Sequence, residues 1–364
     1  MRKLLVLPLL MSSSFASSAQ DKHSGAIDTM CRCRIVLRHV VTLGHEADTI
    51  ALLQQSTVAR DSRGQFYVAP VLPYGAVAIY DSAGRFKSMV GRRGAGPGEL
   101  GRIRDVAIIP GDSLVAYDQN RLVMFAPDSK HVRTSNIISG PRGFYFAALD
   151  NGVLIINNYS PTQPAFYLVD PDFKGGRKFG RSVGGDRFGS DELLFHIAGI
   201  GDGQFVAVQQ NHRFGMQVWD TTGRMVREYT RQPDWFPAWT RADRVRVGFG
   251  TLPSVFGVHY EPSRGRVWVV ATVPDPNWKP QAPPNAPTGS EGGGFPPVPV
   301  AAFDRARDTV IELLDVRSGR VLLSQRFNAS VPYIMETGLL YAHRELPGGL
   351  LVIDIYRPEI LFNR

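Results

Sequence analysis

Four histidines are the side chains in this sequence that best suit catalytic chemistry. They lie far apart along the chain, at His196, His212, His259 and His343. A neutral imidazole is a good transition-metal ligand, so a fold that gathered the four would create a site for a divalent metal such as Zn or Ca. The protein would then be a metal-dependent hydrolase or lyase. Scattered histidines are more often ordinary loop or core residues, so this interpretation is the alternative.

Other signatures of catalysis are missing. The sequence has no H-E-x-x-H motif, and its two cysteines, Cys31 and Cys33, are too few for a structural zinc site. In an oxidising compartment the cysteines can pair with each other or with another chain, and the sequence does not decide their role. We therefore predict a non-catalytic binding protein with no cofactor, and leave open whether it has any catalytic activity.

A second set of side chains suits the binding of a polar ligand. Amide, arginine, histidine and tyrosine side chains recur between apolar runs, and such groups are typical of sites for a protein, peptide or glycan ligand. The candidate ligand-binding residues are Tyr74, Arg92, Arg93, Asn120, Asn157, Asn158, Gln210, His212, Arg213, His343 and Arg344. The alternative is that they are ordinary polar surface residues, and the elements that carry them decide between the two.

Those elements repeat along the chain. A strand followed by a tight turn is clearest at Val77–Arg85, where Asp81 and Gly84 form an Asp-x-x-Gly turn. The turn recurs at positions 81, 126, 170, 220 and 315, in steps of 45, 44, 50 and 95 residues. Periods of about 40–50 residues, each holding four short strands, are typical of β-propeller blades. Two insertions account for the long last step.

Each unit contains four expected strands, which in the first unit cover residues 56–61, 65–69, 77–80 and 86–90. The last unit supplies only three, at 333–335, 339–343 and 350–356, whereas the strand expected at 34–43 has no partner nearby. We predict that residues 34–43 complete the last blade, which would close the ring and remove its exposed edges. The fold class is thus all-β, a six-bladed β-propeller of four-stranded blades over residues 34–364.

The glycine-rich segment Val90–Leu100, which reads VGRRGAGPGEL, is the most specific string in the chain. It resembles the linker that joins blades in secreted bacterial six-bladed propellers similar to the NHL-repeat and TolB-like groups. This resemblance covers about residues 35–364 and implies a fold but little chemistry. A phosphate-binding loop is not indicated, because the Lys-Ser/Thr pair of that motif is missing.

Antiparallel geometry sorts the loops of such a ring onto two faces. Loops between second and third strands share one face with the blade-to-blade linkers, and we call it the loop-rich face. Turns between first and second strands and between third and fourth strands share the opposite face, which we call the turn face. All eleven candidate residues are expected on the loop-rich face, where irregular loops usually carry the binding groups.

Two insertions distinguish the fourth and fifth units. Residues 231–253 link these units and contain Trp235, Phe236 and Trp239, which we expect to form a cap over the blade seam rather than a ligand platform. Residues 274–299 are rich in proline and glycine, which predicts a mobile insertion on the loop-rich face.

The first nineteen residues are typical of an export signal. Arg2 and Lys3 precede a short apolar run at 4–11 and a stretch of small residues, with cleavage expected after Ala19. We therefore expect a periplasmic or secreted protein with a flexible segment at 20–33 and no membrane span. The net charge of +8 comes from scattered rather than clustered basic residues, which does not favour nucleic-acid binding. The sequence names neither the ligand nor the oligomeric state.

Overall fold

The computed structural model describes residues 22–23, 32–45, 48, 50–72, 75–118, 121–137, 145–157, 164–170, 172–173, 175–180, 194–239, 252–277 and 306–362. The expected export signal, most of the segment at 20–33 and nearly all of the proline-rich insertion lie outside these residues. No helix in the described part of the chain is long and apolar enough to cross a membrane.

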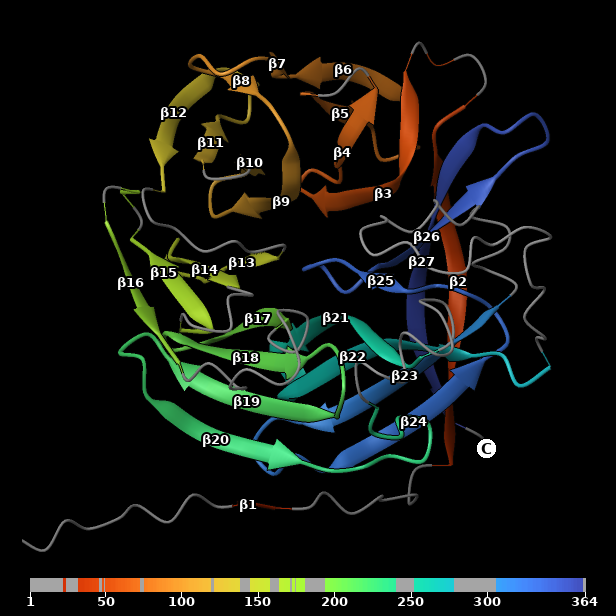
Figure 1. Ribbon diagram of the computed structural model, residues 1–364. Helices are drawn as coiled ribbons and strands as arrows, with labels where there is room; N and C mark the ends of the chain where they lie inside the picture. Colours follow the sequence, from red (N-terminus) through yellow and green to blue (C-terminus); the bar gives the residue numbers. More distant parts are fainter. Residues whose placement is uncertain are drawn as a thin grey trace, which may run out of the picture.

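The described residues form six antiparallel sheets arranged as blades around a common centre (Figure 1). Blade 1 contains β3 (Ala51–Arg60), β4 (Phe66–Leu72), β5 (Val77–Tyr80) and β6 (Phe86–Val90). Blade 2 contains β9 (Ile103–Ile109), β10 (Ser113–Asp118), β11 (Arg121–Phe125) and β12 (His131–Asn136). Blade 3 contains β13 (Phe146–Ala148), β14 (Leu154–Asn157), β15 (Phe166–Val169) and β16 (Gly176–Phe179).

Blade 4 contains β17 (Phe195–Gly201), β18 (Gln204–Gln209), β19 (Gly215–Asp220) and β20 (Met225–Thr230), with β1 (Lys22–His23) parallel to β20. Blade 5 contains β21 (Ser254–Glu261), β22 (Arg266–Pro274), β23 (Arg307–Asp315) and β24 (Val321–Phe327). Blade 6 contains β25 (Tyr333–Ile334), β26 (Leu340–Glu345), β27 (Leu351–Phe362) and β2 (Cys33–Leu43). The predicted six-bladed β-propeller of four-stranded blades is therefore confirmed.

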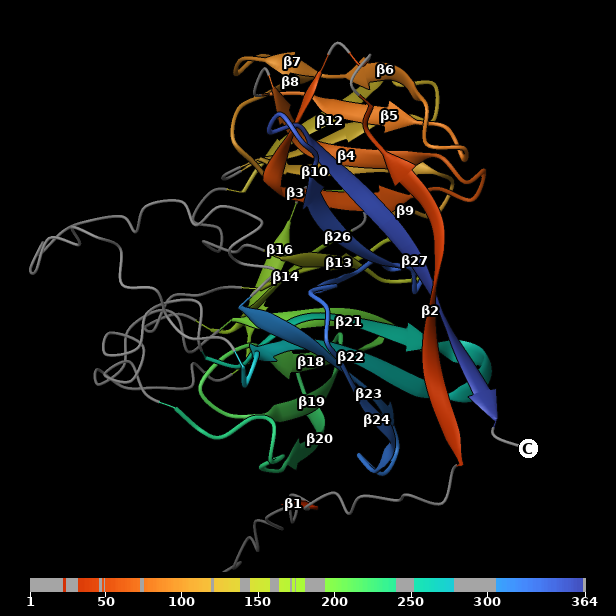
Figure 2. The ribbon, with the colours of Figure 1, turned by 90° about the vertical axis from the view of Figure 1, so that its right-hand side faces the viewer.

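Strand β2 closes the ring, as predicted for residues 34–43. It pairs antiparallel with β27, in a register that runs from Cys33 opposite Phe362 to Leu43 opposite Ile353. Figure 2 shows these two long strands side by side along one flank of the molecule. The amide of Gln325, on the outer strand of blade 5, accepts from the backbone N–H of Ile35 at 2.6 Å and donates to its carbonyl at 2.9 Å. This contact covers part of an otherwise open sheet edge.

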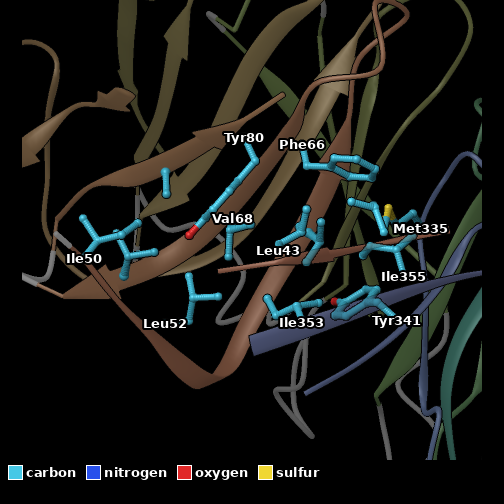
Figure 3. Packing of buried hydrophobic residues seen from close by; sticks show 14 of the residues in the cluster. Leu43, Ile50, Leu52, Phe66, Val68, Tyr80, Met335, Tyr341, Ile353 and Ile355 are labelled. Atoms are coloured by element: carbon cyan, nitrogen blue, oxygen red, sulfur yellow. The ribbon is translucent and has the colours of Figure 1, made fainter. Parts of the chain in front are cut away.

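The closing strand also supplies core. Leu43 is fully buried in a cluster that joins blades 1 and 6, together with Phe66, Val68, Ile353 and Ile355 (Figure 3). The first and last segments of the propeller therefore share one hydrophobic core, in addition to a hydrogen-bonded ladder.

The recurring Asp-x-x-Gly turns close the third and fourth strands, as expected. At Asp81, one carboxylate oxygen accepts from the backbone N–H groups of Ala83 and Arg85, at 2.9 Å each. Gly84 then adopts a φ of +80° and donates its N–H to the carbonyl of Asp81. Asp220 repeats this arrangement in blade 4. The turns are thus structural, because their carboxylates bind their own backbone.

The glycine-rich linker between blades 1 and 2 folds around Glu99. The strands β7 (Arg92–Arg93) and β8 (Glu99–Leu100) pair within it, and the Glu99 carboxylate accepts from the Gly96 N–H at 2.9 Å. A Cβ atom on Gly94 would lie 2.0 Å from that carboxylate. From blade 2, the Arg121 side chain donates to the carbonyl of Ala95 at 2.7 Å. A structural role therefore accounts for the glycines.

Strand order confirms the sorting of loops onto two faces. All blades run from an inner first strand to an outer last strand with antiparallel neighbours, so the ends of the strands alternate between the faces. Gly75, in the loop between β4 and β5, illustrates the loop-rich face, since its Cβ would lie 2.4 Å from the carbonyl oxygen of Leu100 in the linker. The second-to-third loop of blade 1 and the linker after it are therefore in contact.

Candidate ligand site at the central channel

The inner strands begin at the loop-rich face, and several of them carry a polar or aromatic side chain near that first residue. Asp105 is the third residue of β9, Tyr145 directly precedes β13, His196 is the second residue of β17, and Tyr333 is the first residue of β25. Arg307 is the first residue of β23, and a third strand also begins at the loop-rich face. These five residues belong to blades 2 to 6.

Electrostatic interactions show that these groups meet near the centre of the ring. Burial, together with the charges of Tyr333 and Asp105, raises the pKa of Tyr145. Burial lowers the pKa of Arg307 to about 10, against an opposing effect of Tyr333. Blades 2, 3, 5 and 6 thus contribute groups within electrostatic range of one another, and we call this set, with His196 of blade 4, the channel cluster.

Asp105 links three blades. Its carboxylate accepts from the backbone N–H of Phe146 in blade 3 at 3.2 Å and from that of Val106 at 2.9 Å, and it is also hydrogen-bonded to the Thr57 side chain of blade 1. Loss of solvation outweighs these bonds and raises the pKa of Asp105 to about 7. The carboxyl group is therefore partly protonated at neutral pH.

Glu336 adds a second carboxyl group within range. It lies in the turn between β25 and β26 and is solvent-exposed, yet loss of solvation and the charge of Asp105 raise its pKa to about 8. A channel explains both observations, because a group inside it can touch water while protein surrounds it on most sides. The two carboxyl groups disfavour each other's ionisation.

Tyr145, His196 and Gln210 form a compact group across blades 3, 4 and 5. The ring of Tyr145 lies over that of His196, with centroids 4.2 Å apart, and its hydroxyl is hydrogen-bonded to the Gln210 side chain. His196 donates to the backbone carbonyl of Val255 on β21, and burial lowers its pKa to about 3. A side chain of β17 that contacts the inner strands on both sides must lie on the channel side of its blade.

His343 occupies an equivalent seam between blades 6 and 1. It is bonded to the backbone carbonyl of Ser56, and burial lowers its pKa to about 4. Its ring meets that of Tyr333 edge to face at 5.5 Å, while Tyr333 stacks on Tyr341 at 4.8 Å. The aromatic side of the channel cluster is therefore held by ring contacts within blade 6.

Arg307 is the buried cation of the channel cluster. It is 3% exposed, donates to the Thr272 hydroxyl at 2.6 Å, and lies 5.7 Å from the ring centroid of Phe256 on the inner strand of blade 5. Burying a charge costs free energy unless such contacts offset the lost hydration, so the position of Arg307 is tightly constrained.

His212 belongs to a different structure, the cap over the seam of blades 4 and 5. Its ring stacks on Trp239 at 4.2 Å and bonds the Trp239 carbonyl at 3.0 Å. Phe236 is fully buried beneath, and Trp235 donates to the buried carboxylate of Glu312 at 2.8 Å. The prediction that these aromatic residues form a cap is confirmed.

The structure separates the remaining candidates into exposed and buried groups. Arg92, Arg93, Arg213 and Arg344 are exposed, and Arg344 is paired with Asp354. Asn157, at the end of β14, is fully buried. Three further candidates, Tyr74, Asn120 and Asn158, lie outside the described residues. The structure thus distributes the predicted set between the channel and the outer rim, and no contact described here tests their role in binding.

The four histidines have separate surroundings. His196 and His343 lie in different blade seams, His212 lies in the cap, and His259 is bonded to the backbone of Glu336 near the turn face. Within the described ranges, no three His, Cys, Asp or Glu side chains are placed so that they could hold one metal ion. Metal binding stays a prediction for direct measurement.

Sequence reasoning missed most of the channel cluster. Asp105, Tyr145, Arg307, Tyr333 and Glu336 were not among the predicted residues, because the prediction considered loops and these residues lie in strands or directly beside them. A signal was present at Asp105, where a carboxylate interrupts the apolar β9 strand. The convergence of five blades has no signature within any single repeat.

Comparisons with known proteins support the fold. No protein-family model matches the sequence, and no curated protein matches it either. A solved member of the DUF4221 family from Bacteroides vulgatus is 12% identical and covers 91% of this chain and 99% of its own, with a TM-score of 0.62. A Bacteroides fragilis protein described as a candidate exported protein is 10% identical, with coverages of 91% and 96% and a TM-score of 0.54. At these identities the likeness concerns the fold alone, and kinship with NHL-repeat proteins stays a prediction.

Proposed function

We propose that the chain is an exported, non-catalytic binding protein, which recognises a polar ligand on its loop-rich face at the mouth of the central channel. The observation that carries the proposal is the channel cluster, in which five blades place polar or aromatic side chains at the same end of the ring. A concave site with a few convergent polar groups among aromatic rings is the usual form of a ligand site.

The state of the buried histidines favours binding over acid–base catalysis. A general acid or base works best with a pKa near the operating pH, whereas burial holds the pKa of His196 near 3 and that of His343 near 4. Both imidazoles instead donate to a backbone carbonyl of the neighbouring blade. They position the blades around the channel and stay neutral at physiological pH.

Export is supported by the cysteine chemistry. Cys33 is disulfide-bonded, and the sequence has one other cysteine, Cys31, which lies outside the described residues. Structural disulfides persist in oxidising compartments such as the periplasm and the extracellular space. The signal-like N-terminus and the Bacteroides fragilis neighbour described as a candidate exported protein agree with this assignment.

The proposal can be tested by a ligand screen followed by mapping. Thermal-shift measurements on the mature protein would screen short peptides, oligosaccharides and small carboxylic acids. Hydrogen–deuterium exchange with any stabilising compound should then protect amides near Tyr145 and His196, while the turn at Asp220–Arg224 on the opposite face stays unchanged. Protection confined to the turn face, or no stabilising compound in any of the three classes, would contradict the proposal.

A further inference from the structure

Three buried acceptor atoms at the channel have no hydrogen-bond partner. They are Nε2 of His196, Oε1 of Gln210 and Nε2 of His343, and each atom is inaccessible to solvent in the described structure. The residues themselves are 6%, 9% and 6% exposed. Buried polar atoms in folded proteins are nearly always hydrogen-bonded, so an unpaired set at one end of a channel calls for a partner from outside the chain.

The chemistry of all three atoms is settled by the bonds that the same side chains already make. Each histidine uses a ring N–H to donate to a backbone carbonyl, of Val255 for His196 and of Ser56 for His343. Since Nε2 is the unpartnered nitrogen, Nδ1 carries the proton and Nε2 presents a lone pair. The Gln210 side chain bonds the Tyr145 hydroxyl, and its unpaired atom is the amide oxygen. All three atoms are therefore acceptors, which a ligand can satisfy only by donating.

The charges beside these acceptors balance. Asp105 lies within electrostatic range of Tyr145, and Arg307 lies within range of Tyr333. A ligand carboxylate would meet lone pairs at His196 and Gln210 and the negative charge of Asp105, whereas an ammonium group would meet the buried guanidinium of Arg307. A neutral ligand avoids both penalties.

Partly exposed rings complete the surroundings. Tyr145 and Tyr333 are each only partly buried, although one face of Tyr145 is covered by His196 and one face of Tyr333 by Tyr341. Their remaining surface offers apolar contact beside polar acceptors, a combination that suits a molecule with both C–H and O–H groups.

We propose that the ligand is a neutral saccharide or polyol, whose hydroxyl groups donate to Nε2 of His196 and Oε1 of Gln210 beside Tyr145, with Nε2 of His343 as a further acceptor. This inference rests on the proposed binding function and narrows it to one chemical class. Hydroxyl groups are suitable donors here because they supply protons without bringing a net charge into the channel.

The test compares neutral sugars with charged analogues on the intact mature protein. Isothermal titration calorimetry would use a panel of neutral mono- to tetrasaccharides, the corresponding uronic acids and amino sugars, and ZnCl2 alone. At least one neutral sugar should bind, with at least tenfold higher affinity than its uronic acid and its amino sugar. Tighter binding of the uronic acid, the amino sugar or the zinc ion would overturn the proposal.

Matched variants locate the acceptors. Gln210→Met removes an acceptor at the loop-rich end of blade 4, and Gln204→Met alters the first residue of β18, at its turn-face end. The first variant should weaken sugar binding at least tenfold and the second less than twofold, with melting curves confirming that both fold. Equal affinities for the two variants would contradict the proposal.

A crystal structure of the native protein with the bound sugar keeps the test decisive if Gln210→Met does not fold. Sugar hydroxyls within hydrogen-bond distance of His196 Nε2 and Gln210 Oε1 would support the assignment. Ordered water on both atoms with the sugar elsewhere would refute it. A peptide or carboxylate bound at the loop-rich face would overturn only the saccharide assignment, whereas failure of every compound to bind there would overturn the binding function as well.

Discussion

The closing strand offers the sharpest test of the fold, through a comparison of two positions on β2. Leu43 is fully buried between blades 1 and 6, whereas Val40 is 39% exposed. Truncating a buried leucine to alanine removes burial and leaves a cavity, which costs about 2–5 kcal/mol in the free energy of unfolding. A comparable truncation at an exposed position stays within about 0.5 kcal/mol.

These free energies convert into a measurable difference in melting temperature. The entropy of unfolding is about 2.1 cal/mol/K per residue, which gives about 0.7 kcal/mol/K for a propeller of roughly 330 residues. Leu43→Ala should therefore lower the Tm by about 3–7 °C, and Val40→Ala by less than about 1 °C. Both variants keep the same backbone ladder to β27, so the difference isolates the buried side chain.

Differential scanning calorimetry of the mature protein and the two variants provides the measurement. Equal melting temperatures for Leu43→Ala and Val40→Ala would refute the placement of Leu43 in the shared core of the first and last blades. Deletion of residues 34–43 extends the test, because it removes the whole ladder and should unfold or aggregate the protein. A deletion variant that stays monomeric with unchanged melting would show that the ring closes without β2.

Three further predictions concern a turn, a carboxyl group and the cap. Gly84→Ala should destabilise more than Gly111→Ala in chemical denaturation, because both residues have a positive φ but a Cβ at Gly84 would lie 2.3 Å from a backbone carbonyl, whereas nothing lies within 4 Å at Gly111; equal losses would contradict this. Asp105 has a folded pKa of about 7 against about 3.9 when unfolded, so its contribution is complete below pH about 4 and is lost as the pH rises through 7; Asp105→Asn should flatten the fall in Tm between pH 5 and 8, and an unchanged profile would exclude a raised pKa. Trp235→Phe should cost about 1–3 kcal/mol in equilibrium unfolding, because it removes a hydrogen bond to the buried Glu312 carboxylate, and a cost below about 0.5 kcal/mol would place that bond outside the native structure.

Local sequence was sufficient to predict most of the blade architecture. The expected strands at 77–80 and 86–90 coincide with β5 and β6, since Asp81 and Gly84 define the intervening turn through bonds within a few residues. The expected strand at 350–356 was too short, because β27 continues to Phe362. Its last residues pair with the far end of β2, more than 300 positions away, and no local pattern reports such a partner.

The candidate site was predicted less completely than the fold. Gln210 and His343 were predicted as ligand-binding residues and do carry unpaired acceptors at the channel, whereas His212 proved to be part of the cap. Asp105 and Tyr145 were missed, since their importance comes from neighbours in other blades: the Phe146 N–H for Asp105, and the Gln210 side chain for Tyr145.

The sequence by itself determined the repeat, the turns, the number of blades and the strand that closes the ring, because each depends on hydrophobic pattern and turn chemistry within tens of residues. Tertiary structure alone decided which side chains face the channel, which acceptors lack partners and which carboxyl groups have raised pKa values. Those properties depend on burial and on contacts between blades far apart in the chain, so they exist only once the ring has closed.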